Sequence, residues 1–287
     1  RVLTENFNGT KESVDAYMSW GLIQYINKDF SKALLQFEKV ISQSQFPDYE
    51  LSARYWLWRT AQKLDKDRAQ VELQLIVQKF PFSYYGLRAI ADANGGTVSF
   101  EGFNKKSKLK QELWLTPLEK QSWDRFMVLS GAGWYDEANL ELNELPAPQN
   151  AEGLAMMARM YAAAFNYPKT IHILNQAWDQ NPELRTLGLI QTAFPREFTT
   201  LVHDQATQRK LDPKLIWGLI RQESAFNVQA QSTSGALGLM QLIPPTARDI
   251  APVFKIKNLS LPDQMFDPET NVKMGSYYLS KLVSDFN

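Results

Sequence analysis

The stretch IRQESAFN, residues 220–227, places a glutamate three residues beyond the end of the apolar run Leu215–Ile220. Counting back from Glu223 in steps of four reaches Leu219 and then Leu215, so in a helix the carboxyl would share a face with two leucines. We therefore expect Glu223 to point toward the core near the C-terminal end of a helix. Burial and the negative end of the helix dipole both favour the neutral form of a carboxyl. A protonated carboxyl of this kind is what a general acid needs near neutral pH.

A structural alternative is an ion pair between Glu223 and Arg221. Buried glutamates are commonly paired with arginines, although residues two apart in a helix do not face each other. The stretch alone leaves the structural and the catalytic interpretation open, and the segments that follow it favour the catalytic one.

Composition restricts the function further. The 287 residues are enough for about two domains, and Lys+Arg and Asp+Glu both number 31, so nothing indicates attraction to nucleic acid. No apolar run approaches the roughly 20 residues of a membrane-spanning helix. With no cysteine, and with His172 and His203 as the only histidines, we expect no disulfide, no metal and no other cofactor. Because the chain starts at Arg1, we expect its numbering to begin after a removed leader or inside a longer protein.

The first two thirds of the chain are typical of successive amphipathic helices. Between Asp15 and Ser42 the helical spacing is interrupted only at residues 27–29, and Ala33 with Phe37 fits the A-x3-F element of a tetratricopeptide-like hairpin. A second hairpin follows over residues 51–80. Since a strict 34-residue period is not kept, we predict an irregular helical solenoid.

The pattern is interrupted between the hairpins and the next helices. The basic run KKSKLK, residues 105–110, is most simply a solvated loop. Helical pairs resume over residues 117–180, where the methionines and aromatics of LAMMARMYAAAF indicate core packing. A different unit begins near Gln191. We therefore predict two domains, a helical superhelical part over residues 1–190 and a second domain over residues 191–287.

The sequence of the second domain contains several signals for the start of a helix. Asp-Pro at 212–213 begins the helix that leads to Glu223, Pro-Pro at 244–245 opens a short helix, and Asp-Pro at 267–268 caps the last one. Between them, NVQAQSTSGALGLMQ at 227–241 predicts a loop or short strand.

Three motifs in this order, RQESAFN, SGALGLMQLIPPTA and FDPETNVKMGSYYL, resemble those of the soluble lytic transglycosylases of Gram-negative bacteria. The resemblance covers residues 194–286 and extends more loosely to PFSYYGLRA in the helical part. It implies a mainly α fold, in which an irregular α-helical solenoid precedes a lysozyme-like catalytic domain that is α+β but mostly α.

The resemblance also implies an activity. Glu223 takes the place of the family's single catalytic acid/base, and Ser232, Met240 and Gln241 take places in substrate binding. Such enzymes cleave the β-1,4 bond between N-acetylmuramic acid and N-acetylglucosamine and leave a 1,6-anhydromuramoyl end. The implied partners are periplasmic peptidoglycan strands, with other cell-wall proteins as candidates for the helical part, and no nucleic acid.

Each substrate-binding candidate also has a structural interpretation. Met240 fits core packing as well as a glycan contact, and Ser232 is a typical turn residue. For Gln241, a polar residue between apolar neighbours, we favour the functional role. The family often has methionine where this chain has Ile243, and its A-Y-N-A-G motif is absent from the sequence. A lysozyme-type hydrolase and a non-catalytic or impaired glycan-binding scaffold therefore stay open, as do the oligomeric state and endo or exo cleavage.

Overall fold

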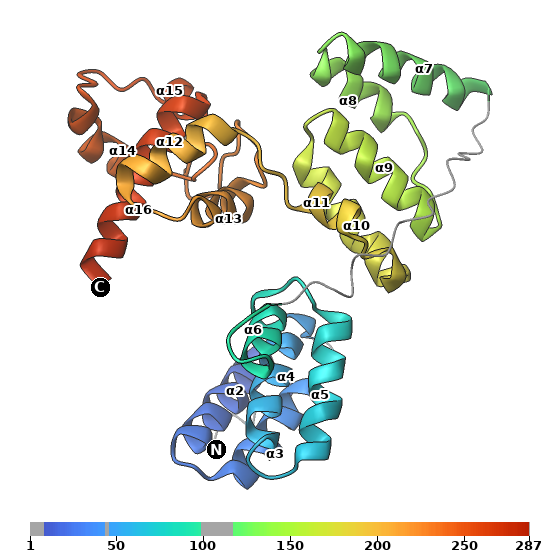
Figure 1. Ribbon diagram of the computed structural model, residues 1–287, viewed down its shortest axis with the longest axis vertical. Helices are drawn as coiled ribbons and strands as arrows, with labels where there is room; N and C mark the ends of the chain where they lie inside the picture. The colour runs from blue at the N-terminus through green and yellow to red at the C-terminus, as the bar shows by residue number, and fades with distance from the viewer. Residues whose placement is uncertain (1–8, 44–45, 99–116, 287) are drawn as a thin grey trace. The chain divides into compact units, whose positions relative to one another are not determined.

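The computed structural model describes residues 9–43, 46–98 and 117–286, and forms two compact units, Arg1–Gly102 and Phe103–Asn287 (Figure 1). The basic run at 105–110 lies outside the described residues. The predicted domain boundary at 190/191 falls inside the second unit and stays a prediction. No described helix combines the length and the apolar character needed to cross a bilayer.

The first unit consists of antiparallel helical hairpins, drawn from blue to teal in Figure 1. Its helices are α2 (Lys11–Ile26), α3 (Phe30–Ile41), α4 (Pro47–Ala61), α5 (Lys66–Lys79) and α6 (Tyr84–Ala93). Each helix packs against the next one in the chain. The two predicted hairpins are confirmed, including the break at residues 27–29.

Phe37 explains why the first hairpin closes tightly. It is fully buried, as is Ala33 one turn earlier, and its ring lies against Gly21 on α2. A Cβ added at Gly21 would approach Cε1 of Phe37 to 2.6 Å, so the close approach of the two helices requires glycine there. The A-x3-F pattern thus marks core positions, as the sequence predicts.

The second unit begins with further helical pairs. They are α7 (Pro117–Gly131), α8 (Tyr135–Asn143), α9 (Ala151–Ala163), α10 (Tyr167–Gln180) and α11 (Leu187–Ala193), with a short 3-10 turn, η2 (Pro182–Leu184). Met157, Met160 and Tyr161 are buried in one cluster between these helices. The prediction that the methionine-rich segment is core is confirmed.

The same unit ends with the helices that carry the three motifs. They are α12 (Thr199–Arg209), α13 (Pro213–Ser224), α14 (Pro244–Ile250), η3 (Ala251–Phe254), α15 (Asp263–Phe266) and α16 (Pro268–Phe286). Asp212 caps α13 by accepting from the Lys214 amide, and Asp267 does the same for α16 through Thr270. In the described part of this region there is no strand, only isolated bridges made by Leu237 to Gln231 and to Leu242.

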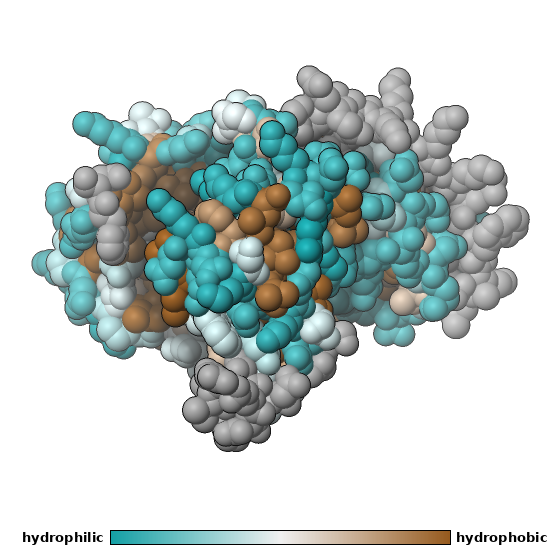
Figure 2. Space-filling model, turned by 90° about the horizontal axis from the view of Figure 1, so that it is seen from below, coloured by the Kyte–Doolittle hydropathy of each residue, from teal (hydrophilic) through white to brown (hydrophobic). Residues whose placement is uncertain are grey.

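One hydrophobic core joins the two halves of the second unit. Tyr167 at the start of α10 packs with Ile216 and Ile220 of α13 and with Phe226 just beyond that helix. Figure 2 shows that one face of the molecule also exposes hydrophobic side chains among hydrophilic ones. The predicted mainly α fold is confirmed.

Candidate active site

Helix α13 buries a different face from the one expected. Ile216 and Ile220 are fully buried and Ser224 is 9% exposed, so positions 216, 220 and 224 form the core-facing row. The row one position earlier ends at Glu223, which is exposed, and begins at Leu215, which is 45% exposed. The expectation that Glu223 points toward the core is therefore wrong. Both rows repeat every four residues, and the pattern alone did not distinguish them.

Arg221 does not pair with Glu223. Its Nε donates to the carbonyl oxygen of Ala193 at 2.9 Å, and its guanidinium carbon lies 4.1 Å from the centroid of the Phe194 ring. Burial lowers the pKa of Arg221, as desolvation does for any cation. Arg221 thus holds α13 to the end of α11, and no described residue forms an ion pair with the Glu223 carboxylate.

Ser224, the other half of the E-S pair, connects α13 to the glycine-rich loop. Its Oγ lies 2.9 Å from the carbonyl oxygen of Leu239 and 3.0 Å from that of Ile220. Directly after it the backbone reverses through two positive φ angles, 47° at Ala225 and 63° at Phe226. The end of α13 that carries Glu223 is therefore fixed to the loop by a buried hydroxyl.

Ser232 holds a turn within that loop. Its Oγ accepts a hydrogen bond from the Ala236 amide at 3.0 Å, and its own amide donates to the carbonyl oxygen of Ala236. The side chain is half-exposed. In this structure Ser232 therefore makes the turn contacts that serine commonly makes.

Gln241 closes the loop from its other end. Its Nε2 donates to the carbonyl oxygens of Ala230 at 3.1 Å and Gly238 at 2.9 Å, and its backbone has a φ of 47°. The NH2 group of the Gln241 side chain, the residue for which the sequence favoured a functional role, is thus used to fix the loop. The half-exposed side chain keeps its carbonyl oxygen, which can still accept a hydrogen bond.

Met240 lies in the core. It is 5% exposed and packs against α16 at Gly275, where an added Cβ would come within 2.5 Å of the Met240 sulfur. Its backbone amide donates to Oδ1 of Asn271 at 2.8 Å. Of its two interpretations, the structure shows the packing one.

Asn271 organises the site, although no sequence pattern marks it as a site residue. It is fully buried, and its Nδ2 donates to the carbonyl oxygens of Leu237 at 3.0 Å and Met265 at 2.9 Å. With the Met240 amide, its one side chain makes three hydrogen bonds to buried backbone. Its position could have drawn attention to it in the sequence. Asn271 is a polar residue four positions before Gly275, on the face of α16 that packs against the loop.

Gly238 is required where this network meets the loop. Its φ is +73°, and a Cβ there would lie 2.0 Å from the carbonyl oxygen of Met265 and 2.3 Å from Nδ2 of Asn271. Gly235 also has a positive φ, +80°, but faces open space. The two glycines of the G-A-L-G segment thus have different functions, one of packing and one of turning.

Residues 200–287 match the family described as "Transglycosylase SLT domain". This match covers the region of the three motifs, and the resemblance found in them is confirmed.

The chain is similar to several curated proteins over this region. It is 33% identical over 116 residues to the soluble lytic murein transglycosylase of Escherichia coli K12, a match that covers 39% of this chain and 18% of that protein. It is 38% identical over 95 residues to the membrane-bound lytic murein transglycosylase C of Mannheimia succiniciproducens, covering 32% of this chain and 26% of that one. The matches thus span about a quarter or less of these relatives.

Two solved structures share the fold over nearly the whole chain. An inactive glutamate-to-glutamine mutant of the lytic transglycosylase Slt from Pseudomonas aeruginosa aligns with a TM-score of 0.68 at 24% identity, covering 100% of this chain and 44% of that one. A 70-kDa soluble lytic transglycosylase in complex with bulgecin A aligns with a TM-score of 0.69 at 21% identity, covering 97% and 43%. The mainly α architecture is therefore that of the Slt-type transglycosylases.

Proposed function

We propose that the SLT domain cleaves the β-1,4 bond between N-acetylmuramic acid and N-acetylglucosamine in peptidoglycan and leaves a 1,6-anhydromuramoyl end. The observation that carries the proposal is the position of Glu223 at the end of α13, where it is exposed, has no ion pair with any described residue, and is fixed beside the glycine-rich loop through Ser224. The relatives named as murein transglycosylases support the substrate class. Since peptidoglycan is the substrate, we place the protein in the periplasm.

Glu223 serves first as acid and then as base. Its protonated carboxyl donates a proton to the glycosidic oxygen as the bond to C1 of the muramoyl residue breaks. The resulting carboxylate then removes the proton from the C6 hydroxyl of the same sugar, whose oxygen attacks C1. The proton is returned to Glu223, and no water is consumed.

The exposure of Glu223 requires that the substrate complete the site. A glycan bound over the end of α13 would exclude water from the carboxyl, and desolvation favours its protonated form. Between Glu223 and Arg248 the sequence has no other Asp or Glu. A substrate-assisted reaction, in which the N-acetyl oxygen takes the place of a second carboxylate, is consistent with this.

The test is digestion of purified sacculi by the chain and by its Glu223→Gln variant, with products analysed by mass spectrometry. We expect the variant to lose release of anhydro-muropeptides by at least about a hundredfold, because glutamine cannot transfer the proton. Asp249→Asn is the matched control, since Asp249 is another exposed acid of the same domain. Release by Glu223→Gln equal to that of the parent and of Asp249→Asn would disprove the catalytic assignment.

The same measurement separates the alternatives. A lysozyme-type hydrolase gives products heavier by one water, with reducing ends. A non-catalytic glycan-binding scaffold gives neither product. The reaction type is therefore determined by product mass and not by the loss of activity alone.

A further inference from the structure

A cleft in the second unit lies outside the site built around Glu223. It has a volume of about 580 Å³, within the range of about 300–1,000 Å³ typical of small-ligand pockets. The start of α8 and the turn between α9 and α10 form one wall. Residues 197–198 and 226–229 form the other, so the segment directly after the E-S motif contributes to the cleft.

A chain of aromatic contacts leads across this cleft. The ring centroids of Tyr135 and Phe165 are 4.6 Å apart, those of Phe165 and Tyr167 6.2 Å, and those of Tyr167 and Phe226 5.7 Å. Tyr167 and Phe226 are buried, whereas Tyr135 is 37% and Phe165 48% exposed. The outer two rings are thus supported from behind and present apolar surface to solvent.

Phe165 has an unfavourable backbone for its side chain. Its φ is 56°, at the turn between α9 and α10, where glycine or asparagine is usual. Its ring packs on Tyr135 and Tyr167 and is otherwise open to solvent. Lys28 and Lys210 have the same left-handed backbone at other helix ends, so the exposed ring of Phe165, and not its φ, favours a ligand contact.

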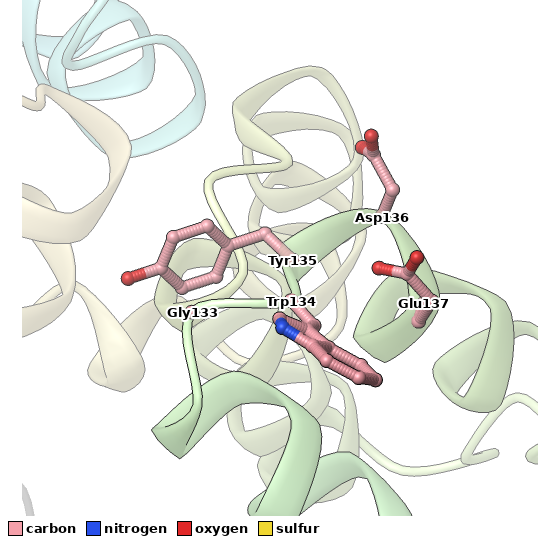
Figure 3. Close-up of a pocket in the computed structure, with 5 residues that line it drawn as sticks. All are labelled: Gly133, Trp134, Tyr135, Asp136 and Glu137. Carbon is pink, nitrogen blue, oxygen red and sulfur yellow. The ribbon is translucent and has the colours of Figure 1, made fainter.

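The turn before α8 adds a third exposed aromatic. Trp134 is 61% exposed and, with Tyr135, lines an adjoining hollow of about 360 Å³. Figure 3 shows the ring of Tyr135 projecting from one side of this turn, with the carboxylates of Asp136 and Glu137 on the other. The cleft therefore continues into a shallow surface with aromatic side chains.

The polar groups of the cleft favour an uncharged ligand. The side-chain amides of Asn139 and Asn166 bond to each other and to backbone, so those of Asn227 and Gln229 are the ones left to meet a ligand. The acids are Asp136 and Glu197, the latter accepting a hydrogen bond of 2.6 Å from the Tyr167 hydroxyl. Among the described residues no lysine or arginine lines it. Such a cleft disfavours carboxylates and suits hydroxyl and N-acetyl groups beside apolar ring faces.

We propose that this cleft binds an N-acetylglucosamine residue of the glycan strand, apart from the bond being cleaved. Tyr135 and Phe165 contact the apolar face of the sugar, and the amides bind its hydroxyl and N-acetyl groups. Phe226 lies three residues beyond Glu223, in the segment directly after α13, so the cleft is next in the chain to the proposed catalytic acid. The inference rests on the proposed function for its choice of ligand.

The test uses chitotetraose, a tetramer of N-acetylglucosamine, and the full chain with Glu223→Gln to prevent turnover. Calorimetry compares this parent with the added substitutions Tyr135→Ala and Phe165→Gly. We expect each to weaken binding about tenfold. Phe165→Gly should keep or raise the melting temperature because glycine suits its φ. The matched control is Tyr84→Ala, an aromatic on α6 that is 72% exposed, which should leave affinity unchanged.

The outcomes separate this inference from the proposed reaction. With Glu223 intact, the two cleft substitutions should raise KM on sacculi and leave kcat unchanged. If all folded variants bind chitotetraose with equal affinity, the cleft is not the sugar-binding site, even if Glu223→Gln is inactive. If only the cleft variants bind chitotetraose more weakly, the sugar-binding site is supported, even if Glu223→Gln stays active. Loss of binding to a free stem peptide, with chitotetraose binding unaffected, would reassign the cleft to peptide.

Discussion

The hydroxyl of Ser224 lies 2.9 Å from the carbonyl oxygen of Leu239 and joins the end of α13 to the loop that ends at Gln241. Both ends of this contact are buried. A buried acceptor that loses its donor carries a desolvation cost that a surface group avoids. The contact therefore determines both local stability and the position of the neighbouring Glu223.

Ser224→Ala should lower the free energy of unfolding by about 1–2 kcal/mol, measured from urea denaturation, because the Leu239 carbonyl loses its donor. Ser232→Ala is the comparison, since its hydroxyl accepts a single bond in a half-exposed turn. It should cost about 0.5–1 kcal/mol. On sacculi, Ser224→Ala should also lower kcat, because α13 is less firmly fixed to the loop. Equal losses of stability in the two variants would show that the buried Ser224 hydroxyl stabilises the protein no more than a half-exposed turn serine does.

Gly238→Ala and Gly235→Ala form a matched pair. Both glycines have a positive φ, which costs an alanine about 1–2 kcal/mol. At Gly238 the new methyl would also lie 2.0 Å from the Met265 carbonyl oxygen, a backbone atom that cannot move alone. We expect Gly238→Ala to lower the free energy of unfolding by about 3 kcal/mol or more. Gly235→Ala should lower it only by the backbone cost. Thermal unfolding of the two variants measures the difference, and similar melting temperatures would show that the loop can adjust.

The helices and their ends could be predicted from the sequence because their signals are local. The Asp-Pro pairs at 212–213 and 267–268 fix helix starts within one residue, and the break at 27–29 separates two hairpin helices as expected. Ala33 and Phe37 were recognised as core because a repeat pattern specifies them directly. Signals of this kind depend on neighbours in the chain and need no knowledge of tertiary contacts.

The arrangement of the site could not be predicted in the same way. Glu223 was expected on the buried face because a four-residue period fits the rows ending at 223 and at 224 equally well. What selects the second row is tertiary, since Ser224 meets the Leu239 carbonyl and Arg221 turns to Ala193. Asn271 was missed for the same reason, because its three backbone partners lie far from it in the chain or on another element.

Asn271→Asp tests the network that the sequence did not reveal. The carboxylate keeps an acceptor for the Met240 amide but places its other oxygen against the carbonyl oxygens of Leu237 and Met265. We expect Asn271→Asp to have a free energy of unfolding lower than that of the parent by about 3 kcal/mol or more at pH 7, and we call this difference its stability deficit. Repulsion raises the pKa of the new carboxyl in the folded state above its unfolded value of about 3.9. The folded protein then binds the extra proton, so the deficit should shrink as the pH falls through that folded value.

Urea denaturation of parent and variant between pH 7 and pH 4 measures this change. Asn271→Leu is the control, since it removes the same three hydrogen bonds without adding a titrating group. Its deficit should stay constant over the same range. A deficit of Asn271→Asp that also stays constant would show that the new carboxyl has turned away from the two carbonyl groups.

Asp267 should make the stability of the parent protein fall as the pH falls, whereas the carboxyl of Asn271→Asp should have the opposite effect. Its hydrogen bonds from Thr270, first the hydroxyl and then the amide at 2.8 Å, lower the pKa of the carboxyl from its ordinary value of 3.8. A carboxyl whose folded pKa is depressed contributes stability above its unfolded pKa and loses it as the pH falls through the folded one. Asp267→Asn can still cap α16 but does not titrate. Between pH 5 and pH 2 the urea midpoint of the parent should therefore fall further than that of Asp267→Asn. The other carboxyls titrate in both proteins and cancel, so parallel curves would show that the cap does not depend on the charge of Asp267.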